Sequence, residues 1–247
     1  MYSVLSVEGC APTPTTRLIS LIRTYPCHSG SMTPSTFGGQ VDLQRMCDEV
    51  AESLRRIYRR DPDPSYLIFP EKRFEIRRIS EQESKILFTQ WLQRASLPYS
   101  IETPTMKTFM LTGVTPQSAL TDVTVYSNEG ALTRVLNIEL KAGQPGMESF
   151  RKDLEKLLQE QVPGMWFHTL EKATPSSWKS LHRKIEQAFV RLEEVFDEGV
   201  STASHSTYFY FCVLTEQATG QAPIPPFNVN FSRWREDLDR GFASVES

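Results

Sequence analysis

The chain has 247 residues, of which 39% are hydrophobic and 11% aromatic, so it can build a folded core and is not globally disordered. Its formal net charge of −3 argues against a uniformly basic nucleic-acid-binding surface, but not against a local basic patch. No stretch approaches the roughly 20 apolar residues of a membrane span and no secretory signal begins the chain, so we expect a cytoplasmic protein.

We expect residues 1–78 to form an N-terminal extension, a flexible arm followed by a helix. Residues 1–40 are rich in Ser, Thr, Pro and Gly, which is typical of a poorly ordered arm. From Val41 to Arg60, apolar residues recur at spacings of three and four, which predicts a helix. The segment Asp61-Pro62-Asp63-Pro64 ends this helix, because a residue before proline disfavours the helical conformation.

Residues 79–247 are expected to form an α/β domain. A helix begins at Ser80, with Glu83 three residues later in a capping box, and runs to about Ala95. Three strands follow, over 99–111, 121–127 and 133–142. The remaining predicted elements are a helix over 147–161, a strand over 165–170, a helix over 175–198, a strand over 207–215 and a short helix over 233–242.

Charged residues interrupt two of these strands, which a short turn at residues 128–130 should join into an antiparallel hairpin. Because side chains alternate between the faces of a strand, Glu139 and Lys141 share one face, and the apolar residues around them point to the other. The hairpin can place Asp122 of the preceding strand beside this pair. Three ionisable groups are therefore expected to converge at one end of a hydrophobic sheet.

Two carboxylates a few ångströms apart repel each other unless a cation lies between them. Mg²⁺ takes oxygen ligands and usually keeps waters in its remaining positions, as phosphodiester hydrolysis requires. Asp122 and Glu139 are therefore candidate metal ligands. Lys141 is a candidate catalytic residue that orients or helps to deprotonate the attacking water, or stabilises charge that develops on the phosphorane.

Asp122, the segment Glu139-Leu140-Lys141 and the order helix, three strands, helix, strand around them resemble the PD-(D/E)XK nuclease superfamily. The resemblance covers residues 80 to about 215 and implies a restriction-endonuclease-like core, with a central mixed sheet flanked by helices. It implies that Asp122 and Glu139 bind Mg²⁺, for which Mn²⁺ can substitute, and that the carbonyl of Leu140 adds a ligand. Thr121 stands where the family's proline precedes the aspartate.

In this superfamily a glutamate on the preceding helix commonly assists the reaction, and the resemblance leaves its identity open here. Glu83 is slightly favoured over Glu81 on the same predicted helix, and Glu102 on the first strand is a rival. On the helix after the motif, Lys152 and Lys156 either face substrate or form exposed ion pairs with nearby acids.

The resemblance implies a metal-dependent endonuclease that acts on DNA, in a phage-defence or restriction system, with RNA as an alternative substrate. Many such nucleases dimerise to cut both strands, so a homodimer or a partner subunit is a further expectation. The competing hypothesis is a non-catalytic scaffold or interaction subunit with a nuclease-like fold, because a fold does not prove an activity. A decayed copy should have lost one of Asp122, Glu139 and Lys141, and all three are present.

Overall fold

The computed structural model describes residues 36–37, 41–61, 67–71, 76–109, 117–128, 131–160, 162–196, 206–215 and 224–246. Most of the arm expected over residues 1–40 lies outside these residues, as does the end of the strand expected over 99–111.

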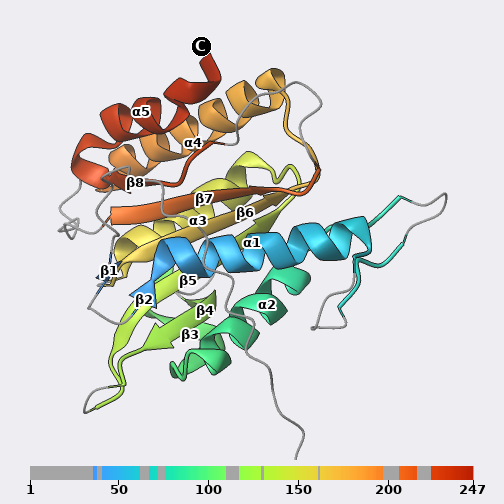
Figure 1. Cartoon of the computed structure of the whole chain (residues 1–247). Coiled ribbons are helices and arrows are strands. Elements are labelled where there is room, and N and C mark those ends of the chain that lie inside the picture. Colours follow the sequence, from blue (N-terminus) through green and yellow to red (C-terminus); the bar gives the residue numbers. More distant parts are fainter. Residues whose placement is uncertain are drawn as a thin grey trace, which may run out of the picture. The chain divides into compact units, whose positions relative to one another are not determined.

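A six-stranded mixed sheet lies at the centre of the fold (Figure 1). In spatial order its strands are β3 (Tyr99–Phe109), β4 (Gln117–Tyr126), β5 (Arg134–Ala142), β6 (Gly164–Leu170), β7 (Ser206–Val213) and β8 (Phe227–Asn230). β3, β4 and β5 pair antiparallel, β5, β6 and β7 run parallel, and β8 pairs antiparallel with β7. The predicted α/β class with a central mixed sheet is confirmed.

Helices cover both faces of this sheet (Figure 1). α1 (Leu43–Arg59) and α2 (Glu81–Arg94) share a hydrophobic core with one face. α3 (Met147–Gln159), α4 (Pro175–Phe196) and α5 (Trp234–Glu246) share a second core with the other face. Parallel strands need a crossover connection, and α3 and α4 lie in the connections from β5 to β6 and from β6 to β7. None of the helices in the described ranges is long and apolar enough to cross a membrane.

The two faces of β5 differ in chemistry, as its alternating sequence predicts. Leu136, Ile138 and Leu140 are buried in the core beneath α1 and α2. Glu139 and Lys141 point to the opposite face, where each forms an ion pair with a side chain of α3. A hydrophobic strand therefore presents two charged groups to a single helix.

The start of α2 follows the predicted capping sequence. Ser80 is the N-cap, and its Oγ accepts a hydrogen bond from the backbone N–H of Gln82 at 3.4 Å. The same Oγ donates to Oε2 of Glu83 at 2.6 Å. These contacts fix the first turn of α2, whose residues Glu81 and Lys85 reach the charged end of β4 and β5.

Three features were not predicted. β8 lies between the strand expected over 207–215 and the helix expected over 233–242, where no element was predicted, because four residues are too few to show a period. A two-stranded sheet joins β1 (Thr36–Phe37) to β2 (Val41–Asp42), and a 3₁₀ turn, η2 (Phe231–Arg233), precedes α5. α1 shares one hydrophobic core with α2 and one face of the sheet.

Candidate active site

β4 and β5 separate at Asp122 and Glu139, and we call this opening the fork. The last regular pair before it joins Val123 to Ile138. Beyond that pair, β4 continues beside β3 and β5 continues beside β6. The backbone N–H of Leu140 donates to Oδ2 of Asp122 at 2.9 Å, so a side chain replaces the missing strand partner.

The carbonyl of Leu140 also faces the fork. In an extended strand the N–H and the C=O of one residue point to the same side. Because the N–H of Leu140 points to Asp122, its carbonyl oxygen lies on the β4 side of β5, where no ladder pair with β4 is formed. This backbone oxygen therefore points to the side of β5 on which Asp122 lies.

Glu139 is the most deeply buried carboxylate at the fork, with 1% of its surface exposed. Its Oε2 lies 2.8 Å from Nζ of Lys156, whereas Oε1 has no hydrogen-bond partner among the described residues. Burial raises the pKa of Glu139 well above its usual range; Lys156 opposes this rise, and the negative charges of Asp153 and Asp122 add to it. A buried acid oxygen that lacks a hydrogen-bond partner in the described part of the chain can take up either a proton or a cation.

Asp122 is partly buried and contacts the helix before the strands. Its Oδ1 lies 2.9 Å from Nζ of Lys85 in α2. Lys85 also forms an ion pair with Glu102 of β3. Burial alone would lower the pKa of Lys85, but its hydrogen bonds to Glu102 and Asp122 raise it, so its amine remains charged.

Lys141 is almost buried and lies between two carboxylates. Its Nζ is 2.6 Å from Oδ2 of Asp153 in α3 and 3.4 Å from Oε1 of Glu81 in α2. Burial opposes the charge on Lys141, yet the neighbouring carboxylates, Asp153 first, raise its pKa above the usual value. The side chain is therefore held as an ammonium group.

α3 supplies two members of the site: Lys156, which the sequence offered as a substrate-facing candidate, and Asp153, which it did not single out. Nζ of Lys156 lies 2.8 Å from both Glu139 and Asp153 and donates to the backbone carbonyl of Leu120 at 2.9 Å. Lys156 does form an ion pair with a nearby acid, as we considered, but the pair with Asp153 is buried rather than exposed, and the lysine does not face outward. Lys152, in contrast, is exposed.

Eight charged side chains thus gather at the fork in two ion-paired networks, which we call together the fork cluster. Lys85 joins Glu102 to Asp122, and Lys141 and Lys156 join Glu81, Asp153 and Glu139. Five carboxylates against three ammonium groups leave a formal charge of −2 when every group is ionised. This residual charge equals the charge that one divalent cation would neutralise.

The structure distinguishes the three glutamates considered for the assisting role. Glu83 is bonded to Ser80 and, within the described part of the chain, makes no hydrogen bond or ion pair with the fork cluster. Glu81 contacts Lys141, and burial together with the nearby charges of Asp122 and Asp153 raises its pKa despite the opposing effect of Lys141. Glu102 reaches the cluster through Lys85.

The donor chemistry of the fork suits a hard divalent cation. Asp122 and Glu139 offer carboxylate oxygens and Leu140 a carbonyl oxygen, and Oε1 of Glu139 is buried with no hydrogen-bond partner in the ranges that the structure describes. In the described residues no three His, Cys, Asp or Glu side chains are arranged as a ready-made metal site. Lysine ammonium groups instead bond the carboxylates, and the flexible Lys85 would have to leave Oδ1 of Asp122 for a cation to bind there.

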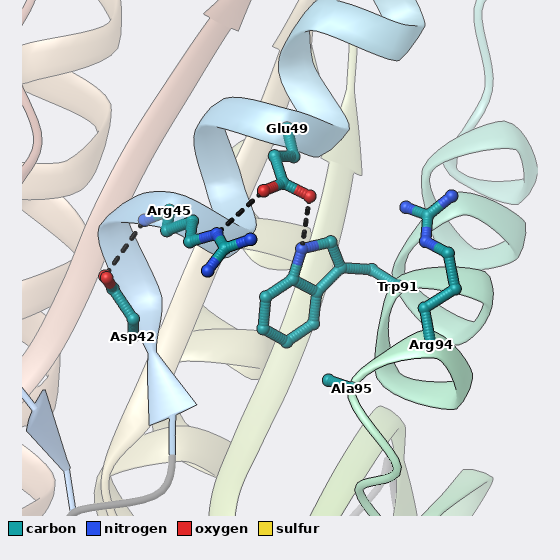
Figure 2. A pocket seen from close by; sticks show the side chains of 6 residues that line it. All are labelled: Asp42, Arg45, Glu49, Trp91, Arg94 and Ala95. Carbon is teal, nitrogen blue, oxygen red and sulfur yellow. Dashed lines mark hydrogen bonds and ion pairs between the residues drawn. The ribbon is translucent and has the colours of Figure 1, made fainter. Parts of the chain in front are cut away.

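A pocket of about 430 Å³ lies elsewhere, between α1 and α2 (Figure 2). Its Glu49 accepts hydrogen bonds from Arg45 Nε at 2.8 Å and from Trp91 Nε1 at 2.9 Å. Asp42 caps α1 through the N–H of Arg45. The acids of this pocket thus join and cap helices.

No protein-family model, curated protein or solved structure matches the chain. The functional argument therefore rests on the geometry and the chemistry of the fork cluster.

Proposed function

We propose that the chain is a divalent-cation-dependent nuclease that hydrolyses phosphodiester bonds at the fork cluster. The observation that carries this proposal is the convergence of Asp122, Glu139 and Lys141 where two strands separate, in a cluster with a residual charge of −2. The order of elements adds support. α2, the antiparallel strands β3 to β5, α3 and the parallel strand β6 follow one another as in the PD-(D/E)XK core.

In this proposal Asp122, Glu139 and the carbonyl of Leu140 hold Mg²⁺, or Mn²⁺ in its place. When bound, the cation supplies Lewis-acid activation of phosphate and water. Glu139 is fixed by Lys156, and Asp122 is fixed by the N–H of Leu140, so both ligands are held in place before a cation arrives.

Lys141 acts in this scheme as a hydrogen-bond donor. Its raised pKa keeps the ammonium form at neutral pH, and an ammonium group has no lone pair with which to accept a proton. It can orient the attacking water or stabilise negative charge on the phosphorane, but it does not deprotonate the water. Glu81, rather than Glu83, is then the assisting helix glutamate, because it contacts Lys141.

DNA is the substrate that we propose first, on the resemblance, and RNA is the alternative. The fork cluster meets solvent at Glu81 and Glu102, whose side chains are 38% and 50% exposed. A phosphodiester would have to approach on this side, because Glu139 and Lys156 are covered.

One observation favours a second candidate, a non-catalytic scaffold. All three lysines of the fork cluster are already ion-paired, as is Asp122, and such a network can be purely structural. The two candidates differ in one property: the nuclease must exchange a lysine contact for a cation, whereas the scaffold need not.

A cleavage assay tests the proposal. Purified protein is incubated with supercoiled plasmid, linear duplex, single-stranded DNA and RNA, in Mg²⁺, Mn²⁺ or EDTA. Glu139→Gln is the test variant and Glu148→Gln the matched control, since Glu148 lies on α3 but pairs with Arg151 and Arg191 outside the cluster. We expect metal-dependent cutting by the wild type and the control only. If Glu139→Gln cut as fast as the wild type, the fork cluster would not be the site of the reaction.

A further inference from the structure

We infer that Asp153 is a positioning residue of the site, which fixes the ammonium group of Lys141 directly and the carboxylate of Glu139 through Lys156. This inference rests on the proposed function and extends it to a residue of α3 that does not belong to the motif. Asp153 itself is not placed against substrate or cation.

The two oxygens of Asp153 serve different lysines. Oδ2 lies 2.6 Å from Nζ of Lys141, and Oδ1 lies 2.8 Å from Nζ of Lys156. Lys156 in turn lies 2.8 Å from Oε2 of Glu139. A single carboxylate therefore links Glu139 and Lys141 of β5 to the same turn of α3.

The spacing of the residues allows this link. Glu139 and Lys141 are two residues apart on a strand, which separates them by about 6.6 Å along its axis. Asp153 and Lys156 are three residues apart on a helix, about 4.5 Å along its axis and on the same side. The side chains of one helical turn can therefore match two successive inward-facing positions of the strand.

Packing holds this turn of α3 in place. Asp153 lies on the apolar side of the helix, where Phe150, Leu154 and Leu157 are buried. The ring of Phe150 stacks on Trp166 of β6 with centroids 5.1 Å apart. A Cβ at Gly164 would lie 3.0 Å from Leu157, so the helix approaches β6 as closely as a glycine permits. With α3 held this way, the Asp153 carboxylate has a fixed position.

Lys141 requires such a support because its side chain is long and has many rotamers. Its other partner is Glu81, which is farther away, at 3.4 Å, and partly exposed. If the contact with Asp153 is lost, the ammonium group can leave the position from which it donates. A displacement of about 1 Å in a catalytic group can cost roughly 100-fold in rate.

Asp153→Asn is the test variant, because it keeps the shape of the side chain and removes its charge. Asp153→Leu, which continues the apolar side of α3, is a second variant should the first not fold. Glu148→Gln serves as the control on the same helix. Three quantities are compared: kcat and KM at saturating Mn²⁺, Mn²⁺ affinity by calorimetry, and the NMR signal of the Lys141 ammonium group.

We expect kcat at saturating Mn²⁺ to fall about 100-fold in Asp153→Asn, with KM within about twofold of the wild type. Mn²⁺ affinity should fall by less than about tenfold, because Glu139 keeps its direct contact with Lys156. The ammonium signal of Lys141, sharp in the wild type and in the control, should broaden or disappear. An unchanged kcat would overturn the inference, and so would a loss of Mn²⁺ binding that matches the loss of rate, since Asp153 would then belong to the cation site.

The NMR comparison needs no cleavage activity, so it separates this inference from the proposed function. If the wild type cuts no substrate, the proposed function fails. Loss of the Lys141 signal in Asp153→Asn would still support the positioning contact, and its persistence would overturn it.

Discussion

Lys156 of α3 and Glu139 of β5 form an ion pair of 2.8 Å in which the carboxylate is 1% exposed and the lysine side chain 7%. Two charges so far from water destabilise the fold unless each keeps a partner. The pair thus couples the stability of the domain to the site proposed for catalysis, which makes it accessible to simple unfolding measurements.

Lys156→Met should lower the free energy of unfolding by about 3 kcal/mol, because it leaves Glu139 buried without its counter-charge. Lys152→Met, the same change at an exposed position of α3, should have an effect within about 0.5 kcal/mol. The double variant Glu139→Gln with Lys156→Met should recover part of the loss. Urea denaturation measures all three, and equal losses in the two methionine variants would contradict the ion pair.

Lys85→Met should increase the affinity for Mn²⁺ about tenfold, because it removes a cation that competes for Oδ1 of Asp122. Lys152→Met provides the control for the loss of a lysine remote from the fork cluster. Isothermal titration calorimetry supplies the dissociation constants. An unchanged or weaker affinity in Lys85→Met would show that Lys85 does not occupy a cation position.

His168 predicts a pH-dependent part of the stability. The residue is fully buried and burial lowers its pKa to about 4, while its Nε2 lies 2.8 Å from the carbonyl of Gly143. As the pH falls, the unfolded chain, with a histidine pKa of about 6.5, takes up the proton before the folded protein does. The contribution of neutral His168 to the free energy of unfolding is therefore complete above pH 6.5 and is lost as the pH falls towards 4.

The amount lost between these two pH values is about 3 kcal/mol for one proton. His168→Gln, which cannot titrate, should lack this part of the decline. Urea midpoints of the two proteins between pH 7 and pH 4.5 provide the measurement. Parallel curves would mean that His168 does not stay neutral in the folded protein.

Glu160→Gln should loosen the β3–β4 hairpin next to the fork. Buried Glu160 accepts the backbone N–H of Met106 at 2.7 Å and pairs with Arg134 at 3.1 Å. Loss of the charge should lower the free energy of unfolding by about 1.5 kcal/mol. Hydrogen exchange at the Met106 amide should accelerate in Glu160→Gln and stay unchanged in Glu148→Gln. If the Met106 amide of Glu160→Gln were as protected as that of the wild type, the contact with Glu160 would not stabilise the hairpin.

Sequence patterns predicted the part of the site that depends on strand geometry. The period of two in β5 placed Glu139 and Lys141 on one face, and the short turn placed Asp122 beside them. Neither inference requires knowledge of how helices pack. The α/β class followed from the order of the predicted elements, whereas the central mixed sheet was implied by the resemblance.

The helix contributions could not be predicted in the same way, because the rotation of a helix over a sheet depends on tertiary packing. Glu83 was slightly favoured over Glu81, but its carboxylate bonds to Ser80 at the helix start, and Glu81 contacts Lys141 instead. Asp153 did leave a signal in the sequence. It interrupts the apolar positions of α3 at a spacing of three from Phe150, where an acid needs a buried partner.

The central claim is that Lys141 works with a divalent cation at Asp122 and Glu139 to cut phosphodiester bonds, and Lys141→Met tests it most directly. The variant and the wild type are compared for Mn²⁺ binding by calorimetry and for cleavage of the same plasmid. We predict that both proteins bind Mn²⁺ and that only the wild type cuts. Cutting by Lys141→Met at the wild-type rate, or a folded wild type that neither binds Mn²⁺ nor cuts, would contradict the account.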